Sequence, residues 1–155
     1  MNKTNTIKFI LLVTFVSILT TLQYGCLDQN INESTTKNQI DSLLTPISTI
    51  EYYTQQQTSN KIVTVKGNVT KILSDDTDGD KHQRFIIRIS NNHTLLIVHN
   101  IDIAPRIENL KVNDVVYVHG EYVWNDQGGL VHWTHHDPDE IHENGWIVIN
   151  DKKYQ

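Results

Sequence analysis

Apolar and polar residues alternate along most of the chain after Lys61, and this pattern predicts a series of short β-strands. A period of two is typical of a strand that buries one face. Gly67 interrupts the first segment, as expected where a barrel strand bends. Turn-forming residues at 91–92 and 126–127 join two pairs of segments as hairpins. The predicted strands are 61–73, 82–90, 93–100, 114–124, 129–134 and 146–149.

The number and spacing of these strands predict the fold class. Five or six short strands, with one longer connection over 101–113, suit a small closed barrel. The segment "LKVNDVVYVHGE" (110–121) resembles the approach to the fourth strand of OB-fold proteins. We therefore expect an all-β, five- to six-stranded OB-like barrel over residues 61–155.

The late hairpin has a self-consistent register. A turn at 126–127 places Glu121 opposite His132, and His119 lies on the same polar side. The apolar side then carries Trp133 opposite Gly120, where the missing side chain leaves room for an indole. A slip of one residue would mix the two sides, so this register is the one we predict.

The early hairpin divides in the same way when its turn lies at 91–92. Arg84 is then opposite His99, and His82 shares their polar side. The residues predicted on the apolar side are Phe85, Ile87, Ile89, Leu96 and Val98. Each hairpin would thus present a histidine with a charged partner on its outer face.

The N-terminus is typical of an export signal. Lys3 and Lys8 precede the apolar run 9–22, and Gly25 and Cys26 follow it. The run is shorter than the roughly 20 residues that span a bilayer, which disfavours a retained anchor. Cys26 resembles the lipidation site of bacterial lipoproteins, and a lipid there would hold the protein on a membrane. The alternative is a simple signal peptide that leaves a free thiol.

Between this signal and the barrel the composition changes. Residues 27–46 are rich in Asn, Gln, Ser and Thr, which is typical of a tether. Residues 47–57 fit either a short helix or an irregular lead-in. The expected organisation is a signal peptide at 1–25, a lipid-anchored tether and lead-in at 26–60, and the barrel at 61–155.

Charge narrows the choice of partners. The chain has a net charge of −5, and without residues 1–25 it has 11 basic and 18 acidic residues, a net of −7. Such acidity disfavours broad binding to nucleic-acid phosphate. A local stripe of Arg84 and Arg88 on a barrel face would be the alternative route to single-stranded nucleic acid.

The strongest chemical feature is the block "HWTHHDPDEIH" at 132–142. Imidazoles interleaved with carboxylates are ligands for a divalent metal such as zinc. A metal-free binding or acid–base site and a rigid hydrogen-bonded loop are the alternatives. The candidate metal ligands are His132, His135, His136, Asp137 and His142.

A second group lies in "HNIDIAPR" (99–106), within the long connection where functional residues are common. Asp102 and Arg106 resemble, loosely, the carboxylate and arginine of thermonuclease-like enzymes, although the contiguous Asp-Thr-Pro of those enzymes is absent. An ion pair between Asp102 and Arg106 that fixes the loop is the commoner outcome of such a pattern, and we predict it here. Catalytic candidates are Glu121, Arg106 and Asp102, and ligand-binding candidates are His82, Arg84, His99, Asn100, Asp102, Arg106, His119 and Glu121.

The acidic turn "DDTDGD" (75–80) fits a solvated turn better than a calcium loop, because the downstream bidentate Glu of an EF-hand is absent. The chain also lacks a Gly-x-Ser-x-Gly motif, a phosphate-binding glycine loop and a dinucleotide fingerprint.

Several blocks together resemble the bacterial domain-of-unknown-function family 3465: "DKHQRFIIRI", "HNIDIAPR", "GEYVWNDQGGLVHWTHHDP" and "HENGWI". The resemblance implies a small exported protein and brings no activity or catalytic residues with it. We therefore expect an exported, lipid-anchored binding module with a His-rich, metal-binding polar face. The alternative is a metal-dependent hydrolase of phosphodiesters on the same barrel.

Overall fold

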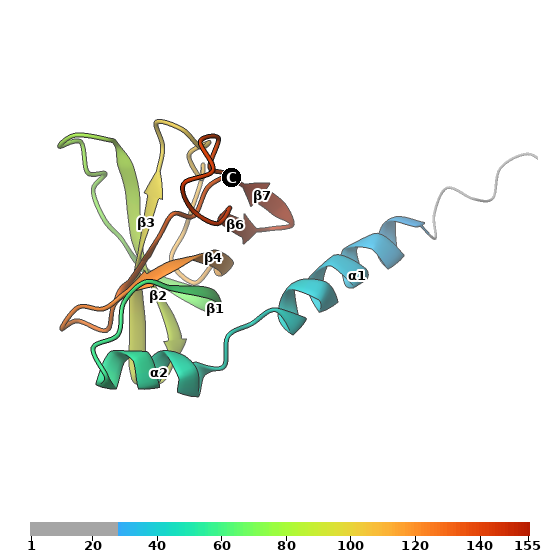
Figure 1. The fold of residues 1–155 in the computed structure, drawn as a ribbon. Helices are drawn as coiled ribbons and strands as arrows, with labels where there is room; N and C mark the ends of the chain where they lie inside the picture. Colours follow the sequence, from blue (N-terminus) through green and yellow to red (C-terminus); the bar gives the residue numbers. More distant parts are fainter. Residues whose placement is uncertain (1–27) are drawn as a thin grey trace, which may run out of the picture.

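The computed structural model describes residues 28–155, and its centre is a closed five-stranded barrel (Figure 1). The strands follow the order β1-β2-β3-β5-β4, and β4 pairs with β1 to close the barrel. β3 and β5 run parallel, whereas the other barrel pairs are antiparallel. This confirms the predicted OB-like topology. The strands are β1 (Lys61–Ile72), β2 (His82–Ser90), β3 (His93–Asn100), β4 (Val115–Val123) and β5 (Leu130–His132).

Two further strands extend the sheet beyond β4. β6 (Trp146–Ile149) pairs with β4 next to β5, and it was predicted at the same residues. β7 (Lys152–Tyr154) pairs with β6 through a turn in which Asn150 and Asp151 have φ values of 49° and 60°. β7 was not predicted, because three residues are too few for a period of two to be recognised.

Two helices precede the barrel. The lead-in forms a short helix, α2 (Ile47–Gln55), which was one of its two predicted forms. The helix buries Ile50 completely against the barrel core. α1 (Asp28–Ser42) is helical where the sequence indicated only a polar tether, and it extends away from the barrel in Figure 1. In the described part of the chain, no helix has the length and apolarity that crossing a membrane requires. Cys26 and the export signal lie outside the described residues.

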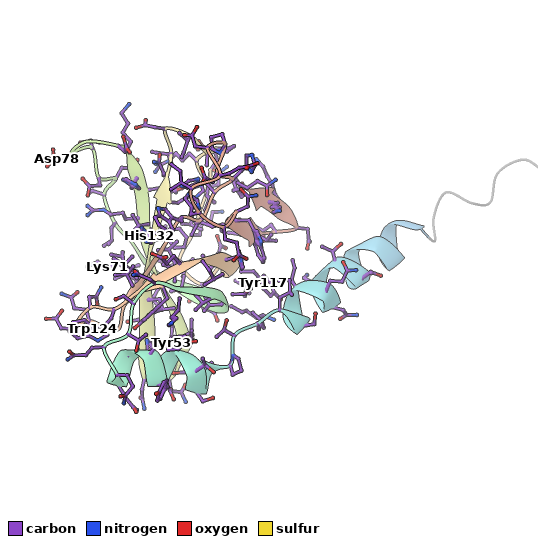
Figure 2. All side chains as sticks on the ribbon, in the orientation of Figure 1. Tyr53, Lys71, Asp78, Tyr117, Trp124 and His132 are labelled. Atoms are coloured by element: carbon purple, nitrogen blue, oxygen red, sulfur yellow. The ribbon has the colours of Figure 1, made fainter. Side chains whose placement is uncertain are left out.

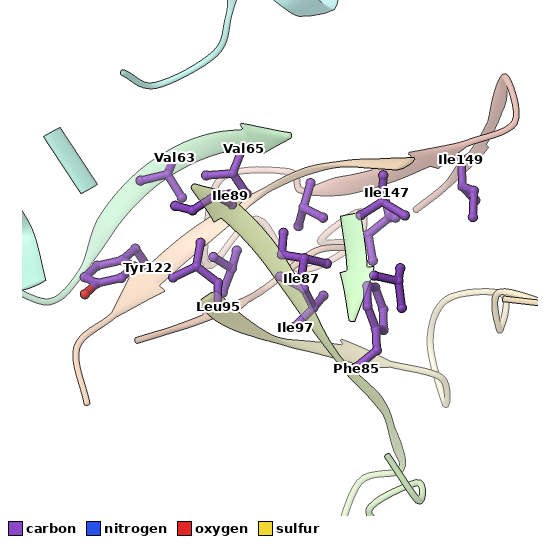
Figure 3. Close-up of a cluster of buried hydrophobic side chains, with 14 of the residues drawn as sticks. Val63, Val65, Phe85, Ile87, Ile89, Leu95, Ile97, Tyr122, Ile147 and Ile149 are labelled. Carbon is purple, nitrogen blue, oxygen red and sulfur yellow. The ribbon is translucent and has the colours of Figure 1, made fainter. Parts of the chain in front are cut away.

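The core consists of inward-facing side chains from every strand of the barrel (Figure 3). On β4, Val116, Val118 and Tyr122 are fully buried, whereas Glu121 faces outward. Glu121 pairs with His132, so the predicted register of the late hairpin is confirmed. The outer face of β4 can therefore carry polar chemistry without cost to the core.

The early hairpin differs from the prediction by one residue. Phe85 pairs with Ile97, not Val98, because a bulge at residues 88–90 shifts the register next to the turn. A shift of one residue exchanges the two faces of β3, so His99 points into the core instead of lying opposite Arg84. The predicted apolar residues Leu96 and Val98 are only partly buried.

Trp133 also differs from the prediction. β5 ends at His132, and Trp133 has a φ of 50°, so its indole leaves the barrel instead of filling the space at Gly120. The His132 carbonyl and the Thr134 methyl group occupy that space. Trp133 is half-buried on the outside, next to the histidines.

Candidate functional site

Hydrogen bonds fix the loop that joins β5 to β6, residues 133–145, which we call the His loop. The Asp137 carboxylate accepts backbone N–H bonds from Asp139 at 3.0 Å and from His142 at 2.6 Å. The Asp137 N–H donates to Asn144 Oδ1 at 2.7 Å. The bonds from His142 and Asp139 hold the pKa of Asp137 below its usual value, so the buried carboxylate is ionised at neutral pH.

His135 and His142 are oriented in the same way within this loop. In each residue, Nδ1 lies 2.8 Å from the carbonyl oxygen of the following residue. A carbonyl only accepts, so Nδ1 carries a proton in both rings, and Nε2 is unprotonated whenever the ring is neutral. The Nε2 of His142 lies 3.8 Å from Asp137 Oδ2. The two rings meet edge to face with centroids 5.0 Å apart. Burial lowers the pKa of His135, which keeps that ring neutral at neutral pH.

Trp133 lies between two imidazoles. Its ring stacks on His132 at 4.8 Å and on His142 at 4.5 Å, with interplanar angles of 15° and 5°. His132 Nε2 lies 3.2 Å from Glu121 Oε1, which accepts a hydrogen bond from the ring N–H. The three stacked rings therefore connect β4 and β5 to the His loop.

His99 lies beneath the His loop and is fully buried. Its Nε2 donates to the Pro105 carbonyl at 3.2 Å, and its Nδ1 accepts from the Thr134 hydroxyl at 2.9 Å. Burial lowers the pKa of His99 to about 4, so the ring is neutral at neutral pH. His99 thus joins β3 and the β3–β4 connection to the His loop, and no ligand in solvent can reach it.

A pocket of about 340 Å³ opens between the His loop, the start of β2 and the end of β3. His82 and Asn100 are register partners, and they bring their strand ends to one side of it. Figure 2 labels His132, one of the lining residues, on the barrel. The pocket unites two segments that the sequence analysis considered separately, through His82, Asn100, His132, His135, Asp137 and His142.

Asp102 and Arg106, the other predicted site residues of the long connection, lie outside this pocket. Asp102 accepts the backbone N–H of Lys81 at 2.8 Å, and Arg106 forms an ion pair with Asp75. The predicted ion pair between Asp102 and Arg106 is therefore wrong, because each finds its partner in the β1–β2 loop.

The β1–β2 loop also bonds to Arg84 of β2. The Arg84 guanidinium donates to the Ser74 carbonyl at 3.1 Å and lies 3.4 Å from the Asp76 carboxylate. The first two carboxylates of the acidic turn are thus engaged by arginines, whereas residues 77–80 are exposed. This arrangement agrees with a solvated turn.

His119 belongs to a separate depression on the outer face of β4. Its Nδ1 lies 2.8 Å from Thr64 Oγ1, its Nε2 lies 3.2 Å from Glu143 Oε1, and its ring stacks on Trp146. His136 is exposed and does not line the pocket of the His loop. The candidate metal ligands therefore divide between the pocket and the open surface.

The donor atoms of the pocket match the kind that a divalent metal uses, namely imidazole Nε2 and carboxylate oxygen. Within residues 28–155, however, no three side chains of His, Cys, Asp or Glu converge in an arrangement that could hold a metal ion. In this pocket, Nδ1 of His135 and of His142 bonds to a backbone carbonyl, which fixes the tautomer that a metal ligand requires.

Seven residues that line the pocket were not among the predicted site residues: Asp80, Val98, Ile103, Trp133, Pro138, Asp139 and Ile141. Asp80 could have been found, because it precedes the strand end that pairs with Asn100. Ile103 and Ile141 are single apolar residues in polar loops, and nothing in a linear pattern separates them from ordinary exposed side chains.

Comparison with known proteins gives one family. The family described as "Protein of unknown function (DUF3465)" matches residues 39–155. This range covers α2, the whole barrel and the His loop. No curated protein matches the chain.

Proposed function

Because the chain belongs to the DUF3465 family of proteins of unknown function, we propose its function from the pocket itself: it is a binding module for a positively charged ligand. The observation that carries this proposal is the chemistry of the pocket atoms. His135 and His142 present unprotonated Nε2 atoms when neutral, and Asp80, Asp137 and Asp139 present carboxylates. These groups accept hydrogen bonds and, with the exception of the imidazoles, carry negative charge.

Among the described residues, neither lysine nor arginine lines the pocket to oppose this charge. The Nε2 of His142 lies 3.8 Å from the Asp137 carboxylate and would offset its charge only when the ring is protonated. The Asp137 carboxylate is partly satisfied by backbone N–H groups, but each of its oxygens keeps further acceptor capacity. A donor-rich cation complements such a pocket, whereas an anion would be repelled.

The negative charge of the pocket also disfavours the hydrolase alternative. A phosphodiester is anionic, and its transition state needs a cation next to the developing charge. Arg106, the candidate for that role, is paired with Asp75 and lies outside the pocket. No observation favours hydrolysis or nucleic-acid binding over the binding of a cation.

We further propose that the module works outside the cytoplasm, held on a membrane through a lipid on Cys26. The basic start, the apolar run and the following cysteine support this location. α1 supports it as a polar spacer of 15 residues, about 22 Å in length, between the anchor and the barrel.

Titration calorimetry of the full-length chain with zinc chloride and with the triamine spermidine tests the function. We expect at least one of these cations to bind, and inorganic phosphate and a thymidine dinucleotide not to bind. Asp80→Asn and Asp139→Asn should each weaken cation binding by about fivefold, as expected for one nearby charge of ~1 kcal/mol. Asp78→Asn is the matched control, because Asp78 is exposed in the same turn but does not line the pocket. Binding of phosphate or the dinucleotide, without binding of either cation, would overturn the proposal.

A further inference from the structure

We propose that the ligand of this pocket is an amphipathic organic cation, meaning an ammonium or guanidinium group attached to an apolar chain. This inference rests on the proposed cation-binding function and names the class of ligand. It is carried by the juxtaposition of the fixed acceptors of the His loop with two exposed isoleucines at the same pocket.

The apolar part of the site comes from two opposed loops. Ile103 lies in the β3–β4 connection with 54% of its surface exposed, and Ile141 lies in the His loop with 78% exposed. Both line the pocket, together with the partly buried Val98 of β3. Exposed apolar side chains gathered next to polar groups are typical of a binding site, because a ligand then gains from covering them.

The backbone holds Ile141 in this exposed position. Ile141 directly precedes His142, whose N–H donates to the Asp137 carboxylate at 2.6 Å. The loop therefore presents the apolar side chain and the acceptor atoms as one fixed unit. A ligand that contacts both loses little free energy in ordering the loop.

An organic cation fits the acceptors better than a bare metal does. A protein-bound first-row metal usually takes three or four converging protein ligands, and no such set of His, Cys, Asp and Glu side chains exists among residues 28–155. An ammonium offers three N–H donors and a guanidinium five, and each N–H needs one acceptor at hydrogen-bond distance. The Nε2 of the neutral His135 ring and the carboxylates of Asp80 and Asp139 provide such acceptors.

The aromatic ring of the site does not replace these acceptors. A cation could bind over the face of an indole, but the Trp133 ring already stacks on His132 and on His142. The positive group of the ligand must therefore lie against the imidazole nitrogens and carboxylates, and its apolar part against the isoleucines.

A homologous series of probes tests this inference. The full-length chain in a mild non-ionic detergent is titrated with methylammonium, butylammonium, hexylammonium, hexanol, hexanoate and zinc chloride. The heat of the same titration into detergent alone is subtracted from each. Affinity should rise from methylammonium to hexylammonium, by up to about fourfold for each methylene that becomes buried. Hexylammonium should bind more tightly than hexanol, and hexanoate should not bind.

Two variants locate the apolar contact. Ile141→Ser should reduce the gain from butylammonium to hexylammonium by at least half, while the affinity for methylammonium stays unchanged. Val112→Ser is the matched control, because Val112 is 52% exposed and does not line the pocket. It should leave the whole series unchanged.

The outcomes separate the two proposals. Equal affinity along the ammonium series, or zinc binding more tightly than every amine, would overturn the amphipathic ligand and leave the cation-binding function standing. If neither zinc nor any ammonium ion binds, both proposals fail.

Discussion

His99 and Thr134 form a hydrogen bond in the protein interior, with His99 Nδ1 2.9 Å from Thr134 Oγ1 and both residues 0% exposed. The bond joins β3 to the beginning of the His loop, which are separated by 35 positions in the sequence. It therefore sets the position of the pocket relative to the barrel.

Replacing Thr134 with valine should destabilise the fold. Valine keeps the shape but leaves His99 Nδ1 as a buried acceptor without a donor, which costs about 1–3 kcal/mol. Urea denaturation followed by circular dichroism measures the change in the free energy of unfolding. The same substitution at the exposed Thr77 serves as the control and should change it by less than ~0.5 kcal/mol. Equal effects at the two sites would contradict the role of this hydrogen bond.

The stability of the fold should fall in mild acid because of His99. Its pKa is about 4 in the folded protein and 6.5 when unperturbed, so between these values the unfolded chain binds a proton that the folded chain does not. The stability from the neutral ring is complete above 6.5 and is lost as the pH falls toward 4, by on the order of 3 kcal/mol. The lowered pKa of His135 acts in the same direction.

Urea denaturation at several pH values across this window checks the pH dependence. His99→Gln should flatten the slope, although it also lowers the stability at neutral pH. A free energy of unfolding that stays constant from neutral pH down to about 4 would show that His99 is not buried in its neutral form.

Glu121→Gln separates a binding module from a hydrolase. The amide oxygen of glutamine can still accept a hydrogen bond from His132 Nε2–H, so the stacked rings and the pocket should persist. The affinity for the cation should stay within about twofold, and the melting temperature should fall by only a few degrees. A variant that still binds the cation but loses a turnover found in the parent would favour the hydrolase.

Gly145→Ala should disrupt the end of the His loop. A Cβ at this position would collide with the backbone of Trp133, Thr134 and His119, where neighbouring groups cannot move aside easily. We expect a loss of about 3 kcal/mol or more, against about 1 kcal/mol for Gly79→Ala, where the cost is only a positive φ. Thermal unfolding of the two variants measures the difference, and similar melting temperatures would contradict this account.

The sequence predicted the barrel well because period-two patterning reports directly on burial. β2, β3 and β6 have their predicted bounds, and the late hairpin pairs Glu121 with His132 as expected. The early hairpin failed because a bulge adds one residue next to the turn, and the sequence around residues 88–93 fits both registers. One such residue was enough to turn His99 from the surface into the core.

The site was predictable in its components but not in its assembly. The His block was identified from residue type alone, and its hydrogen-bonded rigidity was one of the alternatives. That His82 and Asn100 share a pocket with this block depends on the parallel contact of β3 with β5, which is a tertiary feature. Exposed isoleucines such as Ile141 acquire meaning only when the opposite side of the pocket is known.

That parallel contact also bears on how the protein assembles. β3 and β5 meet through only two register pairs, Leu96 with Leu130 and Ile97 with Val131, across more than thirty intervening residues. Contacts of such high contact order are entropically expensive to form and come late in folding. The β1–β2–β3 meander can form earlier, since its strands are neighbours in the chain. The pocket between the His loop and the ends of β2 and β3 is therefore completed only in the final stage of folding, when the barrel closes.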